Sequence, residues 1–301
     1  MNNTRVLALG FFDGVHLGHQ ALLTKARQRA AERGCPAAAL TFDAHPDEVV
    51  FGQRVQLLNR PEDRDLLLRR FGMEEILLLH FDRAMAAMPW ERFVEEILLG
   101  QYHACHVVCG HDFTFGHRGQ GNAQRLREKC TSLGIGCDII EAVSHGGITV
   151  SSTHLRQLIA EGDLEQVAEF LGHPHTMTGT VIRGKQLGRQ LGIPTANVAM
   201  PDGVLPPAFG VYATMVRLPD GSRHMAVTNI GRRPTVEDGM GILAEPWILD
   251  YDGDLYGQTI RLEFHKFLRK EQKFASLNDL QAAILQNAKE TREFFRWNAD
   301  H

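Results

Sequence analysis

RVLALGFFDGVHLGHQALL, residues 5–23, is the stretch of sequence that decides the fold of the first half of this chain. We expect its apolar start to form a strand that ends at Phe12, followed by a loop with Gly14 and Gly18 and a helix that begins near His19. A loop that enters a helix N-terminus presents unpaired backbone N–H groups and the positive end of the helix dipole. The stretch therefore predicts a strand–loop–helix unit that binds phosphate.

Short apolar runs and amphipathic helical stretches continue to alternate up to about residue 140. Helix limits are marked by Gly34, Pro61 and Gly72. Five strands joined by helical crossovers predict an α/β fold with a doubly wound parallel sheet. In such a sheet, ligands bind beyond the carboxyl ends of the strands.

The second half has a different texture, with alternating strands and tight-turn signals from about residue 176. The turn sequences at 219–221 and 252–253 lie between apolar runs, which predicts an antiparallel β-barrel. Ser276 and Asp279 have capping-box spacing ahead of an amphipathic run, so we expect a terminal helix to cover the barrel.

The length of 301 residues suits two domains. Gly172 and Pro174 place a boundary near His173, so we predict an α/β domain over residues 1–173 and a barrel domain over residues 174–301.

Bulk composition excludes several classes of protein. The formal net charge of −4 argues against a nucleic-acid partner. The five cysteines are an odd number without CxxC spacing, and the N-terminal sequence has no secretory pattern, so we expect a reduced, cytoplasmic protein. No apolar run has the length of a membrane span. We expect a monomer or a weak homo-oligomer.

The two histidines of the opening stretch, His16 and His19, stand three residues apart across a glycine. Both can donate to phosphates during nucleotidyl transfer, and the alternative is that they are loop histidines satisfied by backbone carbonyls or water. Their place between an apolar strand and a helix favours the functional interpretation. The predicted nucleotide-binding residues of this segment are Gly10, Phe11, Asp13, Gly14 and Gly18.

Other polar clusters fall just past the expected carboxyl ends of later strands, where the ligand groups of such a sheet gather. Asp112 is suited to holding a ribose or flavin group, with Phe113 and Phe115 as apolar walls, although the two phenylalanines fit a core role equally well. Ser152, Thr153 and Arg156 are suited to gripping the β- and γ-phosphates of ATP. The alternative for these three is a helix N-cap with a solvated arginine.

Four segments, in their order along the chain, resemble the adenylyltransferase half of the bacterial bifunctional riboflavin kinase/FMN adenylyltransferases, or FAD synthetases. They are GFFDGVHLGH, TFDAHP, GHDFTFG and SSTHLR. The resemblance implies a nucleotidyltransferase site that binds ATP at the His16–His19 motif and at the serine–threonine–arginine cluster. It also implies that Asp112 and Phe113 lie at the nucleotide or flavin pocket. Ala44 departs from the family, in which a proline is usual at this position.

A second glycine-rich segment, GTVIRGKQLGRQLGIPTANV, spans residues 179–198. Its glycines suit an arch that wraps phosphates, and the predicted nucleotide-binding residues are Gly184, Lys185 and Gly188. The Thr195 hydroxyl and the Asn197 carbonyl are hard oxygen ligands for Mg²⁺. The alternative is a series of barrel-corner turns in which Asn197 has a left-handed conformation.

The motif GxPTAN resembles that of riboflavin kinases, and the later segments follow the kinase domain in order. This resemblance implies that Thr195 and Asn197 coordinate the metal of MgATP and that Glu245 is the base for the ribityl 5′-hydroxyl. Pro246 removes a ladder donor, so we expect Glu245 on an edge strand or at an opening of the barrel. Trp247 stands where relatives commonly have histidine.

Together the motifs predict a bifunctional transferase of FAD biosynthesis with riboflavin, FMN and ATP as substrates and Mg²⁺ as the metal. Three alternatives are an enzyme with one working half, a non-catalytic flavin sensor, and a cytidylyltransferase-like enzyme. Competent residues at every proposed catalytic position, and the PTAN-bearing barrel, argue against these alternatives.

Overall fold

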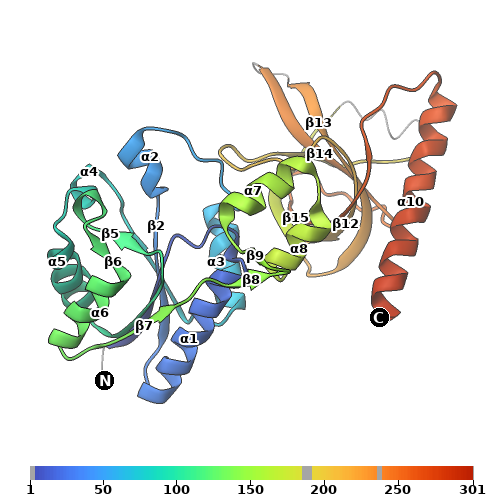
Figure 1. Ribbon diagram of the computed structural model, residues 1–301. Coiled ribbons are helices and arrows are strands. Elements are labelled where there is room, and N and C mark those ends of the chain that lie inside the picture. Colours follow the sequence, from blue (N-terminus) through green and yellow to red (C-terminus); the bar gives the residue numbers. More distant parts are fainter. Residues whose placement is uncertain (1–3, 185–191, 236–238, 301) are drawn as a thin grey trace. The chain divides into compact units, whose positions relative to one another are not determined.

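The computed structural model describes residues 4–184, 192–235 and 239–300, so the predicted nucleotide-binding residues Lys185 and Gly188 lie outside the described residues. The chain divides into two compact units (Figure 1), residues 1–57 with 61–152 and residues 58–60 with 153–301. This division falls earlier than the boundary that we expected near His173. The reason is that α8 (Leu164–Leu171), which precedes the barrel, packs against barrel strands.

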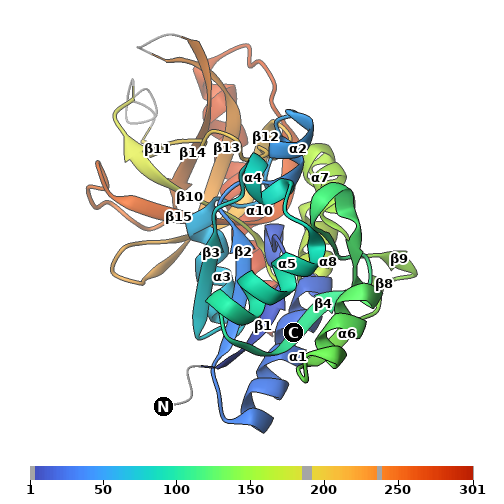
Figure 2. The same cartoon turned by 90° about the vertical axis from the view of Figure 1, so that its left-hand side faces the viewer.

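The first unit is built around a five-stranded sheet in which all neighbouring strands are parallel, as predicted (Figure 2). The strand order is β3-β2-β1-β4-β7, so the order reverses next to β1, which is the topological switch point of the sheet. The strands are β1 (Arg5–Leu9), β2 (Ala37–Phe42), β3 (Glu75–Leu79), β4 (Ala104–Gly110) and β7 (Gly136–Ile140).

Helices cover both faces of this sheet. Leu7 and Leu9 belong to a cluster that includes residues of η2 and α6, whereas Val6 and Ala8 belong to one that includes residues of α1 and α3. Strand residues alternate between faces, so this division makes the sheet doubly wound. The helices are α1 (Leu17–Arg33), α2 (Pro46–Phe51), α3 (Pro61–Arg70), α4 (Arg83–Ala86), α5 (Trp90–Arg92), the π-helix η2 (Phe93–Gln101) and α6 (Ala123–Ser132). Short 3₁₀ turns and hairpins are η1 (Asp13–Val15), η3 (His117–Gly119), β5 (Thr114–Phe115) with β6 (Gly121–Asn122), and β8 (Ser144–His145) with β9 (Ile148–Thr149).

The second unit contains a closed six-stranded barrel with the strand order β10-β11-β14-β13-β12-β15. Every neighbouring pair is antiparallel, as predicted. Its strands are β10 (His175–Ile182), β11 (Asn197–Ala199), β12 (Gly210–Arg217), β13 (Arg223–Thr235), β14 (Gly239–Ile248) and β15 (Thr259–Lys270). The other helices are α7 (Ser152–Glu161), α8 and α10 (Leu277–Asp300).

The terminal helix α10 lies along the barrel, as predicted (Figure 1). Asp279 donates its backbone N–H to the Ser276 hydroxyl at 3.1 Å, which is the capping bond that the sequence predicted. Ala288 packs with Val211 and Val227 on the outer face of the barrel.

Two local expectations were wrong. The first strand ends at Leu9 and not at Phe12, although the following helix begins at Leu17, near His19 as expected. The turn sequence at 252–253 does not join a hairpin, because β14 and β15 are not neighbours in the barrel. It lies in the connection between those two strands, which borders a pocket described below.

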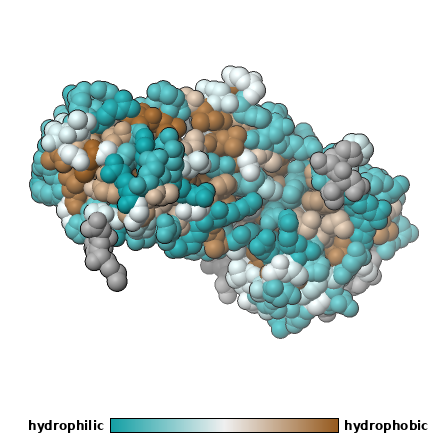
Figure 3. Space-filling model, turned by 90° about the horizontal axis from the view of Figure 1, so that it is seen from below, coloured by the Kyte–Doolittle hydropathy of each residue, from teal (hydrophilic) through white to brown (hydrophobic). Residues whose placement is uncertain are grey.

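Hydrophilic residues cover most of the face shown in Figure 3. Among residues 4–184, 192–235 and 239–300, no helix is both long enough and apolar enough to cross a membrane.

The barrel contains one buried histidine that gives its stability a specific pH dependence. Burial, with a contribution from nearby His173, lowers the pKa of His175 to about 4. The unfolded chain binds a proton at His175 below about pH 6.5, while the folded chain stays neutral there, so stability falls as pH drops from about 6.5 to about 4.

We predict that the free energy of unfolding loses about 2 kcal/mol through His175 alone between pH 7 and pH 5. The measurement is urea unfolding of the full chain at both pH values, with His175→Leu as the matched variant. The variant should lose correspondingly less. Parallel pH curves for the two proteins would show that His175 does not carry the effect.

Candidate active site

The loop between β1 and α1 has an unusual backbone. Three of its residues have positive φ: Phe12 at 59°, Gly14 at 78° and Val15 at 45°. For Phe12 and Val15 this conformation is sterically unfavourable and costs on the order of 1–3 kcal/mol each. Such strain persists only where surrounding contacts hold the backbone, and it concentrates at functional sites.

His16 and His19 form a stacked pair at the start of α1. The His16 side chain caps the helix, with its Nδ1 accepting the backbone N–H of His19 at 3.3 Å. A neutral His16 ring with an acceptor at Nδ1 carries its proton on Nε2, so that nitrogen is the donor. The two rings lie 3.6 Å apart and nearly parallel.

His19 is held in its neutral form. Burial, and then the neighbouring His16 and Arg64, lower its pKa well below the ordinary value. Its Nδ1 is buried and has no hydrogen-bond partner among the residues that the structure describes. A buried ring nitrogen for which the described residues offer no partner, at the N-terminus of α1, suits the binding of an anion.

The structure brings Ser152 to this loop. Its hydroxyl donates to the backbone carbonyl of Asp13 at 3.2 Å, although the two residues are 139 positions apart. Thr153 and Arg156 follow in α7, and the chain division assigns both to the second unit. Their predicted contact with ATP phosphates stays a prediction.

Asp112 follows β4 directly and is exposed, as a ligand-binding group requires. A Cβ at Gly110 would lie 2.8 Å from the Asp112 carboxylate, so a larger residue there would displace this exposed side chain. Phe115 is buried in the core and stacks on the half-buried Phe113 with ring centroids 5.3 Å apart. The core interpretation therefore suits Phe115 better than Phe113.

A further pair at this sheet edge, His80 with Asp43, had no assignment from the sequence. His80 Nδ1 lies 2.6 Å from the Asp43 carboxylate, and this hydrogen bond raises the pKa of His80. Asp43 follows β2 and His80 follows β3, so only the strand pairing shows that they meet.

In the second unit, the barrel register aligns three polar residues. Val198 pairs with Ala244, so the register continued by one residue places Asn197 opposite Glu245. Asn229 is the partner of Glu245 on the other side. Three adjacent strands therefore carry these side chains side by side.

These side chains lie on the outer face of the barrel. The alternating neighbours Val198, Ala244 and Ile230 belong to the interior cluster. Trp247, on the same face as Glu245, packs against the cluster that includes Ala288 of α10. The unusual tryptophan thus has a packing role beneath the terminal helix.

Asn229 holds the predicted base in place and was missed by the sequence interpretation. Its amide lies 3.2 Å from the Glu245 carboxylate and 3.3 Å from that of Glu271. The residue stands in the segment TNIGRRPTV, whose sequence carries no signal for this contact. The pairing of β13 with β14 creates it.

Asn197 belongs to strand β11, so the alternative of a left-handed Asn197 at a barrel corner is wrong. A Cβ at Gly184 would clash with the Asn197 amide, so the glycine lets the backbone approach this side chain. The exposed Thr195 hydroxyl lies two residues earlier.

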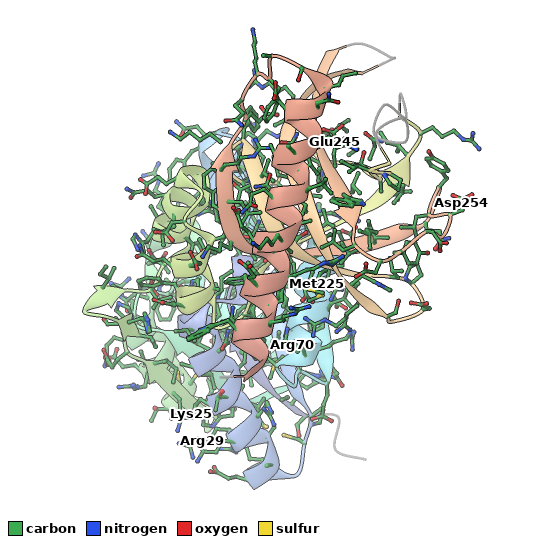
Figure 4. The ribbon with its side chains drawn as sticks, turned by 90° about the vertical axis from the view of Figure 1, so that its right-hand side faces the viewer. Lys25, Arg29, Arg70, Met225, Glu245 and Asp254 are labelled. Atoms are coloured by element: carbon green, nitrogen blue, oxygen red, sulfur yellow. The ribbon has the colours of Figure 1, made fainter. Side chains whose placement is uncertain are left out.

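β11 is the shortest strand of the closed barrel, with three residues. β14 lies between β11 and β13, so Glu245 is not on an edge strand, which corrects one of the two expectations for it. At the residue after Glu245, the Pro246 carbonyl accepts a hydrogen bond from the Ala196 N–H at 3.0 Å. A pocket lies there, lined by Thr195, Pro246 and residues 251–256. Figure 4 marks Glu245 on the barrel and Asp254 in the connection that borders the pocket.

The donor set suits a magnesium ion that arrives with ATP. Among the described residues, no three His, Cys, Asp or Glu side chains form a metal-binding cluster. Mg²⁺ in nucleotide sites takes few protein ligands and fills its shell with phosphate and water oxygens. One hydroxyl and one amide carbonyl beside a glycine-rich segment fit that requirement.

A doubly wound sheet with a histidine loop at its switch point, joined to a barrel with an aligned carboxylate and amide, defines a two-domain, nucleotide-using transferase. A family model described as FAD synthetase matches residues 1–154, and one described as riboflavin kinase matches residues 171–295. The chain belongs to the bifunctional riboflavin kinase/FMN adenylyltransferase family.

Proteins with that name span nearly the whole chain. The one from Listeria monocytogenes is 36% identical over 293 residues, which cover 97% of this chain and 92% of the relative. The one from Haemophilus influenzae is 35% identical over 290 residues, covering 96% and 94%. A crystal structure named as a macrolide-efflux protein from Streptococcus pneumoniae has the same fold, with a TM-score of 0.85 and 29% identity over 96% of this chain and 94% of that one.

Proposed function

We propose that this chain phosphorylates riboflavin to FMN on its barrel and adenylylates FMN to FAD at its histidine loop, with ATP as co-substrate of both reactions. The observation that carries this division is the alignment of Asn197, Glu245 and Asn229 on the barrel, within the segment that matches the kinase model. The strained histidine loop lies in the other segment, which matches the synthetase model.

In the kinase step, the oxygen of the ribityl 5′-hydroxyl attacks the γ-phosphorus of ATP, and the Glu245 carboxylate accepts the proton of that hydroxyl. Asn229 orients that carboxylate through its amide. Thr195 and Asn197 would hold Mg²⁺, which supplies charge neutralisation on the phosphates. The bond from the γ-phosphorus to the bridging oxygen breaks, and ADP leaves.

In the adenylyl step, a phosphate oxygen of FMN attacks the α-phosphorus of ATP, and pyrophosphate leaves. The N-terminus of α1 and the donor nitrogens of His16 and His19 stabilise charge on the α-phosphate. Ser152, Thr153 and Arg156 bind the leaving phosphates, and Asp112 and Phe113 border the flavin or the ribose. The remaining loop residues, Gly10, Phe11, Asp13, Gly14 and Gly18, shape the approach to the phosphates.

We further propose that the protein acts in the cytoplasm, without a nucleic-acid partner, as a monomer or a weak homo-oligomer. All five cysteines are free thiols, which supports a reducing compartment. The test of the overall function is incubation with riboflavin and MgATP, with FMN and FAD resolved by chromatography over time. A single product, or bound flavin without turnover, would favour a one-activity enzyme or a flavin regulator.

The first prediction from this proposal concerns His19→Ala. Removal of one preorganised donor typically costs about 10²- to 10³-fold in rate. FAD formation from FMN should fall by that order, while riboflavin phosphorylation in the same preparation stays within about twofold, because the kinase residues lie in the other unit. Equal loss of both activities in a folded variant would mean one shared site or a structural histidine.

The second prediction compares two neighbours on the barrel. Glu245→Gln keeps shape but removes the proton acceptor, so kinase kcat should fall by about 10²- to 10⁴-fold with little change in KM. Asn197→Ala removes a metal ligand, so it should also raise the KM for MgATP and respond partly to high Mg²⁺. FMN adenylylation serves as the folding control. Near-parental kinase turnover of Glu245→Gln would show that the base is another group.

A further inference from the structure

Arg64 of α3 is a charged side chain that the fold has buried, with 4% of its surface exposed. Burying a guanidinium is costly unless its donors find acceptors. Its Nη1 donates to the Phe11 carbonyl at 3.1 Å, and its Nη2 donates to the Phe42 carbonyl at 2.8 Å. The guanidinium carbon also lies 4.4 Å from the centre of the Phe11 ring.

The two carbonyls belong to the ends of neighbouring strands. Phe11 follows β1 and begins the histidine loop, while Phe42 ends β2. One planar guanidinium therefore ties both segments together at the edge of the sheet where the site lies.

The Phe11 carbonyl is held a second time. The Thr41 hydroxyl, almost fully buried, donates to it at 3.0 Å. The next residue along the chain is Phe12, with its left-handed backbone. Two buried donors thus converge on the carbonyl that precedes the strained part of the loop, and strained residues persist only where contacts hold them.

The charge of Arg64 also acts on the histidine pair. Burial lowers the pKa of Arg64, and the charges of nearby Asp13 and Asp43 oppose this effect. Arg64 in turn is one of the causes that lower the pKa of His19. The arginine thus favours a neutral His19, which stacks on His16 without charge repulsion.

We propose that Arg64 is a positioning residue for adenylyl transfer: by holding the Phe11 and Phe42 carbonyls, it keeps the 12–15 segment in its strained conformation and sets the placement of His16 and His19. This inference rests on the proposed function of the histidine loop. Arg64 acts through the loop and is not placed in contact with substrate.

The geometry makes lysine a poor substitute. A guanidinium offers a fixed fork of donors that reaches two carbonyls at once, whereas an ammonium is a single point of charge. Methionine keeps an unbranched apolar stem but removes both donors and the charge.

The experiment uses Arg64→Lys, Arg64→Met and Thr41→Val in the full chain, with Arg69→Met as the control. Arg69 is an exposed arginine of the same helix that pairs with Asp65 at 3.0 Å. For each variant, kcat and the KM for FMN and for ATP are measured in adenylylation, and the kinase rate is measured in the same preparation.

Misplacement of a reacting group by about 1 Å can cost about 10²-fold, so Arg64→Met should lower adenylylation kcat by about that factor. The KM for FMN and the kinase rate should stay within about threefold. Arg64→Lys can keep one of the two arginine contacts, and Thr41→Val keeps both of them but removes the hydroxyl donor, so each should lose about tenfold. Arg69→Met should match the parent protein.

Full adenylylation by Arg64→Lys and Thr41→Val, or a fall in kcat and in kinase rate together, would overturn the inference. Where Arg64→Met does not fold, the two milder variants decide the question. His19→Ala in the same series distinguishes failure of this inference from failure of the proposed function of the histidine loop. If His19→Ala is slow while the Arg64 variants are normal, only this inference fails; if all are normal, the histidine loop is not the site.

Discussion

The short reversal between β1 and α1 is the constraint on which the first unit depends. The chain leaves the sheet at Leu9 and enters a helix at Leu17, and it does so through backbone conformations that non-glycine residues avoid. Donors from elsewhere in the unit hold the carbonyls of this reversal: the buried Thr41 and Arg64 at Phe11, and the half-buried Ser152 at Asp13. The rest of the unit positions these donors, and the loop presents the histidines.

In the second unit, the register of the strands positions the proposed site residues. Closure of the barrel fixes each strand against two neighbours, so one slipped residue would move every side chain to the other face. The register that buries Val198 and Ala244 necessarily turns Asn197 and Glu245 outward together. The proposed base and the proposed metal ligand thus share one surface because the interior packs in this register.

The sequence predicted the architecture well, because parallel and antiparallel strands leave distinct local patterns. The alternation in the first half and the capping residues of the terminal helix were both visible in local sequence. Long-range contacts were not. In the sequence, Arg64 is one charged residue of an amphipathic helix, and Asn229 is a polar residue of a strand. Their partners come from distant segments, so only the packing of the chain shows these contacts.

Element limits were the other weak point. The strained loop continues the apolar run of β1 through Phe11 and Phe12, so composition alone extends the strand too far. The assignment of α7 and α8 depends on which neighbours they pack against, which the local sequence does not show.

Complementation in trans tests most directly the central claim that the histidine loop and the barrel carry separate reactions. Equal amounts of His19→Ala and Glu245→Gln are incubated together with riboflavin and MgATP, and FAD is followed over time beside each variant alone. The account predicts that the mixture makes FAD, because FMN released by one variant is adenylylated by the other, while His19→Ala alone accumulates FMN and Glu245→Gln alone accumulates neither product. A mixture that makes no FAD, although the first variant releases FMN and the second adenylylates added FMN, would contradict independent sites.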